Sequence, residues 1–509
     1  MISNPTRIAR LALVSGAALT LSACISMAPE ALEPSVVAEM PESFSGTEQA
    51  PGDYTPTAWW RGFEDPVLDA LVTDALASNL DIVEAAARVR QARAQARISR
   101  AALIPQVNAS GSGAETSTPL DGLAFGGLGG EGGEPITRID NTVFNLDATA
   151  SYELDLFGRA RDDYRAARRD AIATTADLQT VQLSSAAETI SAYFDHVDTS
   201  RQLVLTQRTV EALRDRAERT DERFLRGLAD SLELYQIQQD LRATEASVPQ
   251  LKSALAATRS RLALLLGTYP EELDERLSGP LTPRLVFEPV PTGLPINLLS
   301  QRPDINAAWQ RFDGARLRIG ARRAERFPSL TFSAGLGTQA GEIGNAFDFA
   351  NNWTSSLVAS ITAPIFDAGR INANIKAARA TYDQQGAAYA RAVLSAFGEV
   401  ESALADYEQQ RERYALVSRQ VAEAQSSLDL QRRRFAAGVG EYLSYLDALR
   451  NLYQAEIGLS QAARAAAGAR LSVHRALGGD WVGEELAEPL ALDMREADEG
   501  DSRATGEAQ

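Results

Sequence analysis

The sequence predicts an α+β protein made of two similar halves, each with a helix, two strands and a long helical hairpin. Apolar residues keep helical spacing over stretches far longer than a compact domain needs, and short segments of alternating apolar and polar residues interrupt them. The pattern also occurs twice at one constant offset, since Gly158-Arg159 and Glu188 have counterparts in Gly369-Arg370 and Glu399. Repetition of the whole pattern indicates an internal duplication.

The first helix of each half is bounded by proline. In the first half, helical periodicity begins at Asp65-Pro66, where proline suits the first turn, and runs to about Ala102 before Pro105. In the second half it covers residues 297–326 and ends at Phe327-Pro328. We therefore expect one amphipathic helix before each pair of strands.

Four segments are predicted to be strands, namely residues 107–113, 142–156, 329–337 and 353–363. In the second of them Phe144, Leu146 and Ala148 alternate with polar neighbours, which gives a strand one apolar and one polar face. The Gly-rich segment 114–141 is expected to be a flexible loop, because its surroundings do not match a phosphate-binding loop.

A long helical hairpin follows the strands in each half. Residues 210–224 and 248–265 have the heptad spacing of a coiled coil. At about 1.5 Å per residue, a helix over residues 159–224 would be roughly 100 Å long. Gly227 lies between the two runs, and Gly438 takes the same place in the second half, so we expect the chain to reverse at both glycines.

The composition argues against several classes of function. With one cysteine and 2 histidines, the chain has neither a Cys–His zinc site nor an intramolecular disulfide. A formal net charge of −18 disfavours nucleic acid as a partner. His196 and His474 lie in helical runs and are expected to be packed or solvated. We predict no enzyme activity, no catalytic residue, no metal site and no cofactor.

The first 24 residues have the pattern of a bacterial lipoprotein signal. Arg7 and Arg10 precede an apolar segment, residues 11–21, that is too short to cross a bilayer. It ends in Leu21-Ser22-Ala23-Cys24, which resembles the lipobox whose cysteine is lipidated and becomes the mature N-terminus. Cys24 is the predicted lipidation site, and several acyl chains give a stable anchor. Ile25, in place of aspartate, indicates the outer membrane.

These features divide the chain into five segments. We predict a signal peptide over residues 1–23, an acylated extended leader over 24–58, a first repeat over 59–295, a second repeat over 296–481 and a disordered acidic C-terminal tail over 482–509. Four strands are too few to close a membrane barrel, which needs about eight. If the strands lie in a membrane, the protein must therefore oligomerise to pair its sheet edges. A soluble sheet is the alternative.

Several motifs resemble the outer-membrane efflux protein family, and most closely its NodT-type lipoprotein branch. They are Trp59-Trp60 with Phe63, Gln301-Arg302-Pro303-Asp304-Ile305, Phe327-Pro328-Ser329-Leu330, and Arg434-Phe435 with Gly438, Tyr442-Leu443 and Leu446-Asp447. The resemblance covers nearly the whole chain from Trp59 to Trp481. It implies a homotrimer whose strands form one twelve-stranded β-barrel in the outer membrane, continued through the periplasm by an α-barrel of helices.

The resemblance also implies partners and a function. The partners are outer-membrane lipid, a periplasmic adaptor (membrane fusion) protein and an inner-membrane transporter of the resistance–nodulation–division (RND) class. The function is that of a passive exit duct in a tripartite multidrug efflux system. Alternatives are a type I secretion channel, against which Cys24 argues, a metal-efflux channel, and a non-conducting coiled-coil lipoprotein. The 4 Met and 2 His leave little for binding soft metals.

By the same resemblance, the two glycine turns dock onto the adaptor. Gly227 and Leu228 form the centre of the first turn, and Gly438 and Val439 form that of the second. Each turn places an apolar residue directly after a glycine. A helix–turn–helix loop that needs glycine for a positive φ explains the same pattern and is compatible with docking.

A periplasmic gate is implied just after the second turn. Leu443 and Asp447 are four residues apart and so share one helix face. The resemblance makes Leu443 an apolar plug, Asp447 part of an anionic ring, and Glu233 an acid linked to the gate. An ordinary solvated carboxylate is the alternative for Asp447. A member of that family has, after the glycine turn, an arginine that ties the gate shut, and this chain has Gly440 there, which argues against such a latch.

Overall fold

A computed structural model describes residues 26–30, 41, 43–44, 59–119, 138–279, 281, 283, 285, 288, 290 and 295–478. Cys24, the predicted signal peptide and the acidic tail lie outside the described residues. The chain forms two compact units. We call them the sheet unit, with the described residues up to 30 and within 91–171 and 310–386, and the helical unit, with the described residues within 41–90, 172–309 and 387–478.

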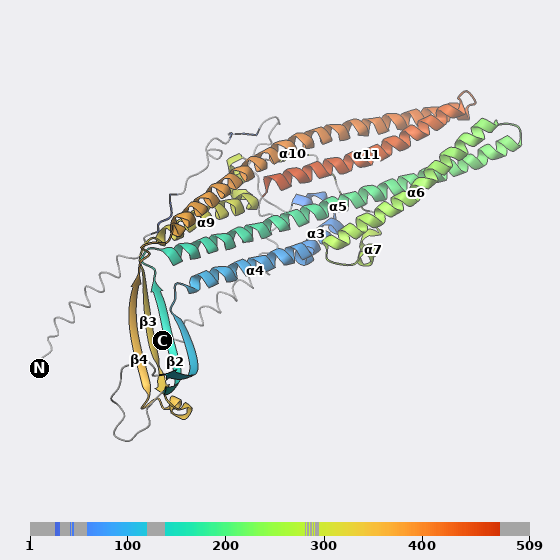
Figure 1. Ribbon diagram of the computed structural model, residues 1–509. Coiled ribbons are helices and arrows are strands. Elements are labelled where there is room, and N and C mark those ends of the chain that lie inside the picture. Colours follow the sequence, from blue (N-terminus) through green and yellow to red (C-terminus); the bar gives the residue numbers. More distant parts are fainter. Residues whose placement is uncertain are drawn as a thin grey trace, which may run out of the picture. The chain divides into compact units, whose positions relative to one another are not determined.

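The sheet unit contains one antiparallel sheet of four strands in the order β1-β2-β3-β4 (Figure 1). The strands are β1 (Gln106–Pro119), β2 (Arg138–Leu154), β3 (Ser329–Ala340) and β4 (Trp353–Thr362), with the 3-10 turn η4 (Ile343–Phe347) before β4. The expected loop over 114–141 is wrong at both ends, because β1 and β2 extend into it. Most of these residues are polar, so ladder hydrogen bonds order them without an alternating apolar pattern.

Strand register places apolar and polar side chains on opposite faces of the sheet. Leu146 lies opposite Gly111 on β1 and Thr338 on β3, whereas its neighbour Asp147 lies opposite Ser110 and Gly337. Because directly opposed residues share a face, the alternation holds across all four strands. The predicted strand pattern, with one apolar and one polar face, is confirmed.

Two long hairpins with matching helix lengths follow the strands. They are α5 (Arg159–Leu225) with α6 (Ser231–Leu265), and α10 (Arg370–Ala436) with α11 (Tyr442–Leu477). Both α5 and α10 contain 67 residues, and each starts directly after a glycine with positive φ, at Gly158 and Gly369. No helix within the residues that the structure describes combines the length and the apolar composition needed to cross a membrane.

The remaining helices precede the strands or connect the repeats. They are η1 (Trp59–Phe63), α3 (Pro66–Ser78), α4 (Leu80–Ala101), η2 (Pro270–Leu273), α7 (Asp274–Leu277), η3 (Pro295–Asn297), α8 (Leu298–Gln301) and α9 (Pro303–Ala324). The single helix expected up to Ala102 is divided at Asn79. Its side-chain oxygen accepts from the N–H of Asp81 at 2.8 Å and so caps α4, while its amide donates to the Leu265 carbonyl at 2.8 Å.

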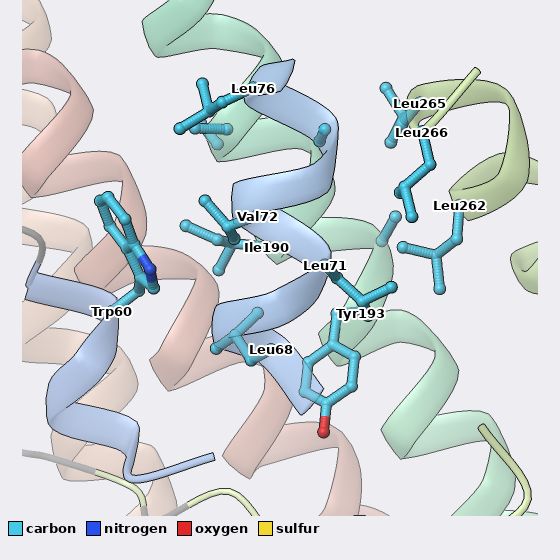
Figure 2. Close-up of a cluster of buried hydrophobic side chains, with 14 of the residues drawn as sticks. Trp60, Leu68, Leu71, Val72, Leu76, Ile190, Tyr193, Leu262, Leu265 and Leu266 are labelled. Carbon is cyan, nitrogen blue, oxygen red and sulfur yellow. The ribbon is translucent and has the colours of Figure 1, made fainter. Parts of the chain in front are cut away.

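The largest core of the helical unit surrounds α3. Figure 2 shows Leu68, Leu71, Val72 and Leu76 of this helix between Trp60 and leucines at the end of α6. Ile190 and Tyr193 of α5 belong to the same cluster and are fully buried. The Tyr193 hydroxyl donates to Asp65, whose other oxygen caps the first turn of α3 at 2.9 Å from the Val67 nitrogen.

Both histidines are packed inside the helical unit. Nδ1 of His196 lies 2.9 Å from the Thr258 hydroxyl, and His474 of α11 is buried beside a second apolar cluster. Burial, and the positive charge of Arg470, lower the pKa of His474 to about 3. The folded protein therefore holds a neutral imidazole far below the pH at which an exposed histidine takes up a proton.

Replacing His474 by leucine should make unfolding less sensitive to acid. The folded pKa lies below the unfolded one, so the stability contribution is intact above about pH 6.5 and falls as the pH drops toward 3, by up to about 1.4 kcal/mol per pH unit. Urea unfolding at pH 7.5 and pH 4.5 measures how much unfolding free energy the parent and His474→Leu each lose between these two pH values. Equal losses would contradict a buried neutral imidazole.

Candidate functional site at the helical turns

The first hairpin reverses through a hydrogen-bonded turn centred on glycine. The N–H of Gly227 donates to the Phe224 carbonyl at 2.9 Å, and the N–H of Leu228 donates to the Arg223 carbonyl at 2.8 Å. This pair of bonds defines a Schellman motif, which requires a left-handed residue. Gly227 supplies it with a φ of 72°. Leu228 is 65% exposed, although the residue at this position commonly packs back onto its own helix.

The second hairpin reverses in the same way. The N–H of Gly438 donates to the Phe435 carbonyl at 3.0 Å, and that of Val439 donates to the Arg434 carbonyl at 3.1 Å. Gly438 has a φ of 73°, and Val439 is 70% exposed. A Cβ at Gly440 would come within 2.9 Å of the Arg434 Cβ and of the Phe435 nitrogen, so this turn requires glycine at position 440. The expected reversal at both glycines is confirmed.

Glu233 belongs to the first turn. The carboxylate of Asp230 caps α6 by accepting from the Glu233 N–H at 2.7 Å. The Glu233 side chain pairs with Arg223 at 3.4 Å, and Arg223 also donates to the Leu228 carbonyl at 3.1 Å. Glu233 therefore fixes Arg223 across the hairpin, next to the exposed Leu228.

Leu443 and Asp447 project from one face of α11. Both are exposed, and the Asp447 side chain is 67% exposed. Their positions follow from their neighbours Tyr442 and Leu446, which are buried in a cluster with Val210, Leu213, Ile237 and Leu241 of the first hairpin. Since that cluster occupies one side of α11, residues 443 and 447 face away from it.

Sequence reasoning missed a charged residue beside Asp447. Nη1 of Arg450 lies 3.3 Å from the Asp447 carboxylate, and Nη2 of the same guanidinium pairs with Asp240 of α6. Spacing of three residues on a helix could have identified the first pair. The second pair, between Arg450 and Asp240, joins different hairpins, so sequence spacing does not predict it. Together the three groups carry a net charge of −1.

An arginine also contacts the aromatic residues around the second turn. The guanidinium of Arg216, on α5, lies 4.7 Å from the ring centre of Tyr445, 5.7 Å from Phe435 and 5.9 Å from Tyr442. Cation–π contacts of this kind contribute about 0.5–2 kcal/mol. Arg216 thus connects the first hairpin to both helices of the second, and local sequence patterns could not predict this.

Ion pairs and hydrogen-bonded turns make up this region. Among the residues described, no cluster of three or more His, Cys, Asp or Glu side chains is arranged to hold a metal ion. The site consists of two exposed apolar turn residues, Leu228 and Val439, and one exposed helix face with Leu443 and Asp447. Exposed apolar side chains of this kind suit contact with another protein.

The chain is similar in sequence to a protein family and to individual known proteins. The sequence profile described as "Outer membrane efflux protein" matches residues 71–268 and 294–479. Cation efflux system protein CusC of Escherichia coli O6:H1 is 30% identical over 468 residues, which cover 91% of this chain and 97% of that protein. Outer membrane protein OprJ of Pseudomonas aeruginosa is 32% identical over 471 residues, covering 91% and 94%.

A solved structure agrees with this placement. The open state of the MtrE outer membrane channel of Neisseria gonorrhoeae has a TM-score of 0.77 at 28% identity, covering 90% of this chain and 98% of that one. The profile matches each repeat separately, and the similarity to both relatives extends over nearly their full length. The chain belongs to the outer membrane efflux protein family.

Proposed function

We propose that the chain forms, as a homotrimer, the outer-membrane channel of a tripartite RND efflux system. The observation that carries the proposal is the open four-stranded sheet. Its outer strands β1 and β4 each have one side unpaired within the sheet, and its apolar face is exposed, with Val107, Leu357 and Ile361 between 72% and 82% exposed. In lipid, each unpaired backbone group costs several kcal/mol, so neighbouring copies must supply the missing pairs.

Three copies would join β1 of one protomer to β4 of the next and close a barrel of twelve strands. The apolar face would contact lipid, and the polar face with Asp147 and Thr149 would line the passage. The helical hairpins would continue the passage into the periplasm as a passive conduit without catalysis. Energy would come from the inner-membrane transporter, coupled through a periplasmic adaptor.

The cargo we propose is small organic molecules. The names of the relatives refer to cation efflux in one case and only to the outer membrane in the other, so membership alone allows either cargo. Only 4 Met and 2 His occur in this sequence, which supports organic cargo over soft metal ions. We infer that Cys24, in its lipobox, carries the acyl anchor, which supports the efflux branch over type I secretion.

A charge on the apolar face of β4 should prevent assembly, whereas a charge on the polar face should not. An arginine facing lipid costs about 2–4 kcal/mol, and every protomer would carry it. Leu357→Arg should therefore reduce the membrane-inserted trimer at least tenfold, whereas its neighbour Ser356→Arg serves as the polar-face control. Particle mass in detergent and single-channel steps in planar bilayers measure this. A parent protein that gives no steps at any voltage would support the non-conducting alternative.

We further propose that Leu443, Asp447 and Glu233 act at the periplasmic gate, with Leu443 narrowing it. Leu443→Ala should raise the resting conductance. Asp447→Ala should lower cation preference, because it leaves a neutral Arg450–Asp240 pair, and Arg450→Gln should raise that preference. Reversal potentials under a salt gradient measure the cation preference of Asp447→Ala and of Arg450→Gln. Shifts in the same direction for Asp447→Ala and Arg450→Gln would exclude these groups from the passage.

The two turns are proposed to dock onto the adaptor, through Gly227 and Leu228 in one and Gly438 and Val439 in the other. Val439→Asp should weaken adaptor binding at least tenfold, because a carboxylate would replace an exposed apolar contact. Val439→Ile keeps that contact and should bind as the parent does. Titration of the purified adaptor against immobilised trimer measures the affinity. Equal weakening by both variants, or by neither, would remove Val439 from the interface.

A further inference from the structure

A short N-terminal segment, residues 26–30, is held against α5 and α9 in the sheet unit. We call it the strap. The Ser26 hydroxyl donates to the Asp162 carboxylate, with distances of 3.0 Å and 2.8 Å to its two oxygens. Asp162 lies in the first turn of α5 and is fully buried. Burial raises the pKa of Asp162 and the Ser26 hydrogen bond opposes that shift, so the strap stabilises the carboxylate.

Two arginines of α9 hold the backbone of the strap. Nη1 of Arg323 donates to the Met27 carbonyl at 3.1 Å, and Nη1 of Arg316 donates to the Pro29 carbonyl at 2.9 Å. The Arg316 guanidinium is itself oriented by Asp313, which is buried and accepts from its Nε at 2.7 Å. The strap is therefore bound at alternate residues by groups that other parts of the fold position.

A glycine makes room for the strap on the same face of α9. A Cβ at Gly320 would lie 2.6 Å from the Ala28 nitrogen and 3.0 Å from the Ala28 Cα, and it would also meet the Asp162 carboxylate. Residues 316, 320 and 323 have the spacing of one helix face. Any side chain at position 320 would displace the strap or separate it from Asp162.

We propose that this strap site holds the acylated N-terminus beside the junction of sheet and helices. The lipid anchor and the strands would then enter the membrane at matching depths. The proposal rests on the channel function proposed above. Asp162 lies eight positions after the end of β2, and four residues separate the end of α9 from the start of β3. Cys24 precedes Ser26 by two positions, a span of at most about 7 Å, so an acyl group on Cys24 would enter the bilayer next to this junction.

If the strap were not docked, the acyl anchor could lie much farther from the junction of sheet and helices. Phe44 packs in an apolar cluster of the helical unit, and a flexible chain of the length between Cys24 and Phe44 has an end-to-end distance of about 25 Å. Restricting that distance to about 7 Å raises the local concentration of the anchor at the junction by on the order of 10²-fold. We therefore expect the strap to matter most when the sheet is first inserted and paired with its neighbours.

Two glycines of α9 provide a matched test in the full lipidated chain. Gly320→Ala and Gly314→Ala make the same change within one helix and gain the same helix propensity. A Cβ at Gly314 would make ordinary contacts of 3.4–3.5 Å, whereas one at Gly320 would collide with the strap. Cleavage after Glu30 by a glutamyl protease should become about tenfold faster in Gly320→Ala, and trimer assembly in phospholipid vesicles about tenfold slower. Gly314→Ala should change neither rate.

Ser26→Ala removes a strap contact without altering α5 or α9, and should give smaller changes in the same directions, with lipidation confirmed by mass. Unchanged cleavage in both strap variants would overturn the docking, as would equal effects of Gly314→Ala. If the strap variants are cleaved faster but assemble at the parental rate, the strap does not align the lipid anchor with the sheet during assembly. If the parent and Gly314→Ala form no trimer, the channel function fails, while the difference in cleavage still tests the docking.

Discussion

The backbone ladder between β2 and β3 is the interaction on which the rest of the structure depends. It joins strands from the two repeats, from Phe144 opposite Ala340 to Leu154 opposite Leu330. The hairpin β1-β2 and the hairpin β3-β4 thereby become one sheet with a common apolar face. The same register fixes where α5 and α10 begin, since each starts a few residues after β2 or β4 at a left-handed glycine.

Charged pairs between α5 and α9 then hold the helices against each other next to the sheet. Arg169 lies 2.8 Å from Asp313, Arg322 lies 2.7 Å from Asp163, and Arg318 pairs with Asp170. Partly exposed pairs such as the last two contribute about 0–1 kcal/mol each, so their main effect is to select one alignment of the two helices. The strap depends on that alignment, because Asp162 comes from α5 whereas Arg316, Gly320 and Arg323 come from α9.

Periodicity and glycine placement predicted the parts of the fold that local physics decides: the strand faces, the long hairpins and both turns. The division at Asn79 escaped prediction because a single capping amide in an alanine-rich run resembles any exposed polar residue. At the site, the shared face of Leu443 and Asp447 followed from spacing. The contacts of Arg216 with the second turn and of Arg450 with Asp240 did not, because they join distant segments whose pairing depends on how the hairpins pack.

The two turns share one backbone conformation but differ in charge. Arg226 and Asp230 flank the glycine of the first turn, where the second has Ala437 and Glu441. In the homotrimer proposed above, six turns would follow an approximate sixfold rotation in backbone and only a threefold rotation in electrostatic potential. A ring of six identical partner subunits would meet two alternating environments and would need interfaces that tolerate both. A ring of three could instead select one kind of turn.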